Sequence, residues 1–190
     1  MSSRLSKVDE SDPRVAEAFR RTRESRGFVS NLLATMCHAP ELQKAHSAQG
    51  HILRFESDLT ELQRELAVCL TVRDVPYGWA HHGQLLHALG FTDAQMAAVK
   101  SGRVPDGLSE ADQALCAFCL AYAACKGVPD TVLARFRKHF SDKQAVEVGM
   151  LVSNYLAAGA FIIAFQPEIE GPEILARELE WQKIRPGAAA

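Results

Sequence analysis

The sequence has no large excess of charge of either sign, and this balance argues against several classes of partner. Lysine and arginine together number 21, aspartate and glutamate number 23, and the formal net charge is -2. Such a chain has no basic field to attract nucleic acid or an anionic lipid surface. We therefore expect partners that are neither nucleic acids nor membranes.

An apolar leader and a disulfide framework are also missing. The first seven residues contain no apolar run of the kind found in a secretory signal. The five cysteines are an odd number, and they lie in apolar, helix-like stretches rather than in a loop-rich scaffold. This usage fits reduced thiols, because disulfides are rare in the cytosol. The expected location is the cytoplasm.

The sequence has no alternating strand pattern of convincing length and no glycine-rich phosphate loop. Apolar residues recur instead at intervals of three and four, which is the helical period. Thr60 and Ser109 stand where side chains cap the first turn of a helix. The 190 residues are 47% hydrophobic, which is enough to bury a core. The pattern predicts an all-α protein with about eight helices.

Long apolar runs are few, and the run from 149 to 165 could be mistaken for a membrane span. Ser153 and Asn154 interrupt it, and Pro167 ends it. A single spanning helix needs about 20 predominantly apolar residues. We therefore interpret the run as a helix buried in the core or in a subunit interface.

Changes of composition divide the chain into three predicted parts. Residues 1–27 are expected to form a charged N-terminal helical arm, and residues 28–166 the main helical domain. Residues 167–190 are expected to form a polar C-terminal tail with one short helix.

Proton-transfer side chains are concentrated between Tyr77 and His82, where the sequence reads Tyr-Gly-Trp-Ala-His-His. Trp79, His82 and Leu86 recur at intervals of three and four, so His82 should share an apolar, inward stripe of its helix. His81 falls on an adjacent stripe and is expected at the edge of the buried face. Adjacent helical residues point about 100° apart, so the two histidines make a poor metal chelate.

An acidic side chain is expected to be inside on the preceding helix. Glu65 lies three, four and seven positions before Val68, Cys69 and Val72, which places its carboxylate on the apolar side. Burial would raise the pKa of such a carboxyl group, and an imidazole exchanges protons near neutral pH. Glu65 and His82 are therefore candidates for acid/base chemistry.

Taken together, these residues resemble the carboxymuconolactone decarboxylase and alkylhydroperoxidase D-like superfamily. The resemblance covers roughly residues 28 to 165 and rests on the segments 31–42, 63–68, 77–82, 89–93, 109–112 and 139–142. It implies a helical fold and assembly into a homotrimer or homohexamer through long apolar helices. The apolar run 149–165 would supply such a helix.

The resemblance is weakest at the residues of the peroxidase branch. That branch carries Cys-x-x-Cys ahead of its histidine, and the aligned positions here are Val75 and Gly78. Peroxide reduction of this kind needs an attacking and a resolving thiol. Many relatives also carry a carboxylate at the position of Gly78, so its absence predicts an enlarged substrate pocket. A separate Cys-x-x-Cys, Cys116 to Cys119, lies mid-helix in an apolar run and is interpreted as core packing.

The resulting hypothesis is a cofactor-independent lyase or isomerase, similar to carboxymuconolactone decarboxylase, that decarboxylates a small carboxylate or lactone or shifts its proton. The predicted catalytic residues are His82, Glu65, Tyr77 and His81, and the predicted pocket residues are Trp79, Gly78 and Cys69. Neither a cofactor nor a metal is predicted. Two alternatives stay open: an alkylhydroperoxidase-like redox protein that uses Cys69, and a non-catalytic binding module with a degenerate site.

Overall fold

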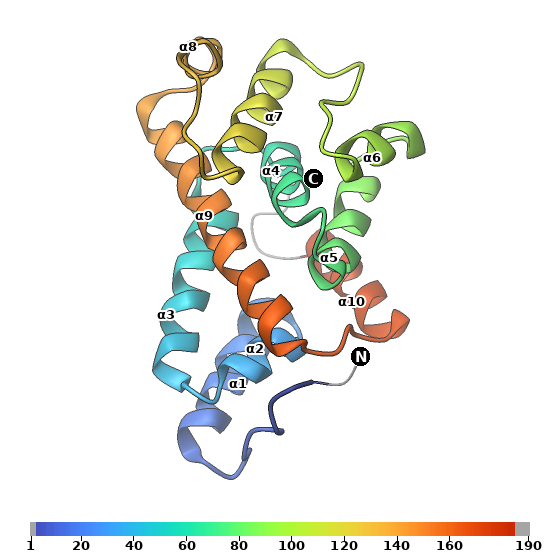
Figure 1. The fold of residues 1–190 in the computed structure, drawn as a ribbon. Coiled ribbons are helices and arrows are strands. Elements are labelled where there is room, and N and C mark those ends of the chain that lie inside the picture. The colour runs from blue at the N-terminus through green and yellow to red at the C-terminus, as the bar shows by residue number, and fades with distance from the viewer. Residues whose placement is uncertain (1–2, 185–190) are drawn as a thin grey trace. The chain divides into compact units, whose positions relative to one another are not determined.

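The computed structural model describes residues 3–184, and these residues form ten α-helices and one short π-helical segment, with no strand among them (Figure 1). The elements are α1 (Pro13–Arg26), α2 (Asn31–Met36), α3 (Pro40–His51), η1 (Ile52–Glu56), α4 (Glu61–Val72), α5 (Pro76–Ala88), α6 (Asp93–Lys100), α7 (Glu110–Ala123), α8 (Asp130–Arg137), α9 (Asp142–Phe165) and α10 (Pro172–Ile184). The predicted all-α class is confirmed. The prediction of about eight helices was slightly low.

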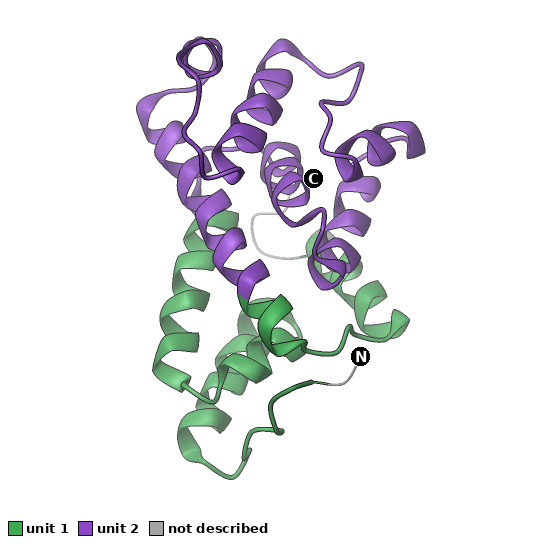
Figure 2. Ribbon diagram, in the orientation of Figure 1, with its two compact units in different colours: residues 1–55, 161–190 green, residues 56–160 purple. Residues whose placement is uncertain are grey.

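The chain divides into two compact units, coloured separately in Figure 2. Unit 1 comprises residues 1–55 and 161–190, and unit 2 comprises residues 56–160. This division by compactness differs from the three parts expected from composition. The expected division into arm, main domain and tail stays a prediction.

Unit 2 is built around α4, which packs against α5, α6 and α7. Thr60 begins α4 with a reciprocal capping box, in which its side chain accepts from the Gln63 backbone and the Gln63 side chain accepts from the Thr60 backbone. Ser109 caps α7 in the predicted way. The fully buried core of this unit includes Leu66, Leu70, Leu86, Leu115 and Leu151.

An aromatic stack joins α7 to α8. The rings of Phe118 and Phe136 lie 4.2 Å apart between centroids, and those of Phe136 and Phe140 lie 4.5 Å apart. Phe136 is completely buried. The stack fixes the short α8, whose remaining side chains are mostly exposed.

Unit 1 contains α1, α2, α3 and α10. Val15, Ala18 and Phe19 of α1 form a buried cluster with Cys37. Gly27 ends α1 in a left-handed conformation with φ 79°, and Trp181 of α10 covers it so closely that an added Cβ would be 2.9 Å from the indole. The C-terminal helix therefore packs onto its unit through Trp181.

Helix α9 has the length and composition that would also suit a membrane span. It runs for 24 residues with a mean hydropathy of 1.8 in its most apolar window, and 39% of that window is buried. Leu151 and Val152 are completely buried, whereas Val146 is 65% exposed. One face of α9 thus belongs to the core, and another carries exposed apolar side chains.

Candidate active site

Helix α4 brings one carboxylate into the interior of unit 2. Glu65 is 4% exposed, and Val68, Cys69 and Val72 on the same side of the helix are almost completely buried. The predicted inward orientation of Glu65 is confirmed. Burial of a carboxylate is costly unless it is hydrogen-bonded, so the identity of its partner matters.

One partner is His82 on α5. The Nδ1 atom of His82 and the Oε2 atom of Glu65 lie 2.8 Å apart, and the two side chains are 10% and 6% exposed. A short turn places them opposite each other: the Val75 N–H donates to the Val72 carbonyl, and Pro76 then begins α5. When Glu65 is ionised it can only accept, so Nδ1 is then the donor of this hydrogen bond.

A third side chain at this pair was not predicted from the sequence. The ring of Tyr155 on α9 meets the His82 imidazole edge-on, with centroids 4.9 Å apart and an interplanar angle of 88°. Tyr155 lies in the apolar run that we interpreted as core or interface, and a lone tyrosine there gave no distinct signal. The contact restricts rotation of the imidazole.

Tyr77 and His81 form a second pair on α5. Their rings stack with centroids 4.7 Å apart and an interplanar angle of 25°, and each residue is 5% exposed. The expected edge position of His81 was therefore wrong. Because α5 packs against both α4 and α6, more than one of its stripes is covered.

The predicted pocket residues Trp79 and Gly78 lie in different surroundings. Trp79 is half-buried, and the Lys100 ammonium lies 4.5 Å from the centre of its indole. Gly78 faces α4, where an added Cβ would lie 2.8 Å from the Val72 Cβ. The expected enlargement of the pocket at Gly78 is therefore wrong, because the absence of a side chain there lets two helices pack closely.

The cysteines of the interior are held as thiols. Burial, with a further contribution from the nearby Glu65 carboxylate, raises the pKa of Cys69 well above its usual range. Burial also raises the pKa of Cys116 to about 12 and that of Cys119 well above its usual range. A thiol is a poor nucleophile until it ionises. Cys125 alone is exposed among the five.

Within residues 3–184, no group of three or more His, Cys, Asp or Glu side chains is arranged to hold a metal ion. No fully buried side-chain nitrogen or oxygen of the described chain lacks a hydrogen-bond partner. Glu65 and His82 thus form a hydrogen-bonded pair in the interior of unit 2.

No protein-family model and no curated protein sequence matches the chain. Several solved structures share its fold. An alkylhydroperoxidase AhpD core protein, described as an uncharacterized peroxidase-related protein from Ralstonia eutropha JMP134, has 18% sequence identity and a TM-score of 0.77, over 94% of this chain and 97% of that one. A cysteine-to-alanine variant of the debrominase Bmp8 in complex with 2,3,4-tribromopyrrole has 18% identity and a TM-score of 0.73, over 94% and 98%.

A peroxidase-related protein from Silicibacter sp. TM1040 is similar to the same degree. It has 18% identity and a TM-score of 0.73, over 88% of this chain and 91% of that one. Matches that span nearly the whole of both chains establish the fold, and identities this low establish nothing finer. The chain has the alkylhydroperoxidase D-like helical fold, as the sequence resemblance predicted.

Proposed function

We propose that this protein is a cofactor-independent acid/base enzyme that acts on a small carboxylate or lactone, with His82 as the proton-transferring group and Glu65 as the residue that orients and balances it. The observation that carries the proposal is the 2.8 Å contact between two side chains that are both at least 90% buried. Such a pair holds its imidazole in one tautomer, which general acid/base catalysis requires.

The chemistry follows from the two nitrogens of His82. In a proton shift, Nε2 accepts a proton from the carbon next to a carbonyl, and the electron pair of that C–H bond moves toward the carbonyl oxygen. Glu65 stabilises the imidazolium that forms, and the imidazolium returns the proton to a different carbon. In decarboxylation, Nε2 first takes a proton from solvent, the C–C bond to the carboxylate breaks, CO₂ leaves, and the imidazolium protonates the carbon that retains the electron pair.

The developing negative charge needs a hydrogen-bond donor, which is usually the largest contribution to such catalysis. Tyr77 and His81 are the candidate donors, since their stacked rings lie on the same helix as His82. Trp79 and Cys69 stay predicted pocket residues.

The proposal is tested by turnover of a panel of small lactones, keto acids and aromatic carboxylates. We expect His82→Ala and Glu65→Gln to lose at least a hundredfold in kcat/KM on any compound that the wild type converts, as loss of a general acid or base does. His87→Ala is the matched control, because His87 lies on the same helix and is exposed. Turnover that persists in His82→Ala and Glu65→Gln would remove the assignment.

A redox function is the second candidate. It is suggested by the similar structures, because two of them are described as peroxidase-related. The thiols count against it: Cys69, Cys116 and Cys119 are completely buried, and their raised pKa values keep them protonated. Consumption of an organic hydroperoxide that is lost in Cys69→Ser would favour the redox candidate. Ligand binding without any reaction would favour a binding module.

We further propose that the exposed face of α9 is covered by other copies of this chain in a cytoplasmic homotrimer or homohexamer. Val146 and Met150 are 65% and 45% exposed on one stripe of this helix, and burying apolar area is worth about 25 cal/mol per Å². Light scattering should give a mass three or six times 20.8 kDa. A monomeric wild type would contradict this proposal, and Val146→Glu should lower the mass.

A further inference from the structure

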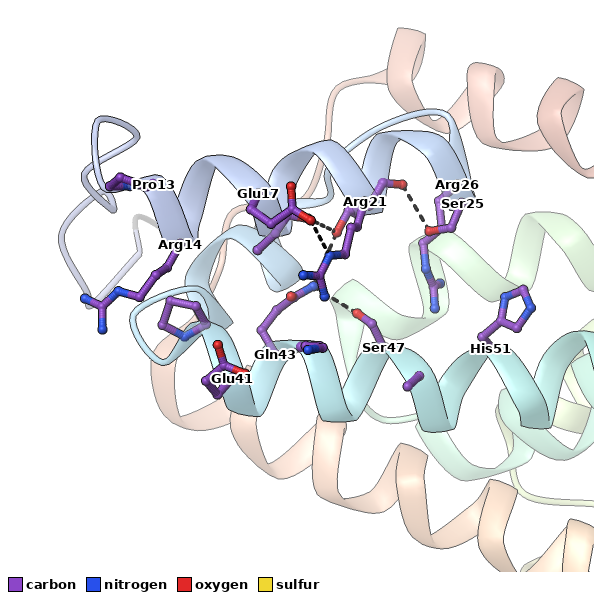
Figure 3. Close-up of a pocket in the computed structure, with 15 residues that line it drawn as sticks. Pro13, Arg14, Glu17, Arg21, Ser25, Arg26, Glu41, Gln43, Ser47 and His51 are labelled. Carbon is purple, nitrogen blue, oxygen red and sulfur yellow. Dashed lines mark hydrogen bonds and ion pairs between the residues drawn. The ribbon is translucent and has the colours of Figure 1, made fainter.

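A groove of about 480 Å³ lies between α1 and α3 in unit 1, on elements that contribute nothing to the Glu65–His82 pair (Figure 3). Its volume lies in the range of sites for small organic ligands. Ala18 and Ala48 line its walls together with Pro13 and Pro40. These short or rigid side chains leave room for a ligand with an apolar body.

The floor of the groove has a fixed hydrogen-bonding pattern. The Thr22 hydroxyl donates to the Ala18 carbonyl at 2.8 Å, so its oxygen must accept from the Gln43 amide nitrogen, 3.3 Å away. The same nitrogen donates to the Ser47 hydroxyl oxygen at 2.9 Å. Both hydrogens of the Gln43 amide are thereby used, and this fixes which atom of the amide is the oxygen.

Two hydrogen-bonding groups remain on this floor for a ligand. Gln43 is 3% exposed, and its Oε1 accepts no hydrogen bond from the described residues, so this atom is not fully buried and reaches the groove surface. The Ser47 hydroxyl hydrogen likewise has no acceptor in the described part of the chain. One amide acceptor and one hydroxyl donor therefore line the bottom of the groove.

The rim carries an oriented guanidinium. The Nε atom of Arg21 donates to the Glu17 Oε1 atom at 2.6 Å, which holds the side chain along α1. In Figure 3, Arg21 and Arg26 extend from α1 over the groove toward α3. The two terminal nitrogens of Arg21 make no hydrogen bond to any described residue. A guanidinium held in this way presents the planar fork that binds a carboxylate through two hydrogen bonds.

The charge of the rim favours an anion as well. Arg14, Arg21, Arg26 and Lys44 line the groove with the carboxylates of Glu17 and Glu41, and Arg14 is paired with Asp12 at 2.7 Å, so one positive charge is in excess. We propose that the α1–α3 groove binds a small amphipathic carboxylate. Its carboxylate lies on Arg21, its apolar body runs between Ala18 and Ala48, and a polar substituent, where present, meets Gln43 and Ser47.

The proposal is tested by titrating the intact protein with octanoate in a calorimeter. Charge-assisted hydrogen bonds are about twice as strong as neutral ones, so Arg21→Met should weaken octanoate binding by about tenfold or more. Arg20→Met is the matched control, since Arg20 also pairs with Glu17, at 2.8 Å, but does not line the groove. It should leave the octanoate Kd unchanged. Ala48→Trp, at an exposed position, should block binding without disturbing the core.

Three further titrations separate this proposal from its competitors. 1-Octanol should bind at least tenfold more weakly than octanoate, and octyl phosphate no more tightly, because the site is expected to fit a planar monoanion. His82→Ala should bind octanoate like the wild type, which separates the groove from the proposed active site. Equal binding by wild type and Arg21→Met, equal binding of 1-octanol, or no octanoate binding at millimolar concentration would each overturn the proposal.

Discussion

Helix α5 carries two histidine–carboxylate pairs in opposite surroundings. His82 and Glu65 lie 2.8 Å apart, with side chains that are 10% and 6% exposed. His87 and Asp93 lie 3.4 Å apart, with side chains that are 58% and 101% exposed. Both pairs join an imidazole on α5 to a carboxylate on a neighbouring helix. What differs is the water around them.

The comparison shows why only one of these pairs is a candidate active site. Exposed ion pairs contribute little, with a median of about 0–1 kcal/mol, because solvent screens them. A buried pair is desolvated, so each partner depends on the other, and removal of one leaves a costly charge behind. Proximity of a histidine and a carboxylate is therefore weak evidence for function until burial is known.

The largest expected effect is the loss of one partner from the buried pair. His82→Ala should lower the free energy of unfolding by about 3 kcal/mol, because the buried Glu65 carboxylate loses its contact with the imidazole. The exposed equivalent, His87→Ala, should change it by no more than about 0.5 kcal/mol. Urea denaturation of both variants measures the difference. A similar loss of unfolding free energy in the two variants would contradict the claim that burial distinguishes the two pairs.

A sharper version replaces both members of the buried pair. Glu65→Leu combined with His82→Leu should recover much of the stability lost in His82→Ala, since apolar side chains of suitable volume often replace a buried ion pair without loss. The double variant should nevertheless be inactive. A stable but inactive double variant would show that the pair is needed for activity rather than for folding.

The next largest effect concerns the close approach of α4 and α5 that brings the pair together. Gly78→Ala should destabilise the protein by about 1–3 kcal/mol, because the new Cβ would lie 2.8 Å from Val72. In a helix interior without this contact, the same change would stabilise by about 0.5–1 kcal/mol. Thermal unfolding of Gly78→Ala shows whether the substitution lowers or raises the stability. Adding Val72→Ala should relieve part of the loss.

The buried thiols predict a smaller, pH-dependent effect. Burial raises the pKa of Cys37 to about 11 and that of Cys116 to about 12. Above a pH of about 9 the unfolded chain releases thiol protons that the folded chain retains, so the free energy of unfolding falls as pH rises from about 9 to 11. Denaturation at several pH values measures this slope. The slope should be reduced in Cys37→Ala, and an unchanged slope would contradict the assignment.

The smallest expected effect is at the third member of the site. Tyr155→Phe retains the edge-on ring contact with His82 and serves as the reference for that contact. Tyr155→Leu removes that contact, and a further loss of about 0.5–1.5 kcal/mol is expected. If the two variants behave alike, the ring does not restrain the imidazole.

Helical spacing was enough to predict the orientation of Glu65 and His82, because one apolar stripe of each helix faces a neighbour. It could not predict that they touch, since their contact depends on the turn before Pro76 and on the missing side chain of Gly78. It placed His81 wrongly because α5 is covered on more than one stripe. It missed Tyr155 because a contact from a distant helix leaves no local pattern. The groove between α1 and α3 was missed for the same reason.

The most direct test of the account is turnover of the lactone, keto acid and carboxylate panel by four proteins: wild type, His82→Ala, Glu65→Gln and His87→Ala. The account predicts a compound that wild type and His87→Ala convert at similar rates, and that His82→Ala and Glu65→Gln convert at least a hundredfold more slowly. A compound that all four proteins convert equally would contradict the claim that the buried Glu65–His82 pair performs the chemistry.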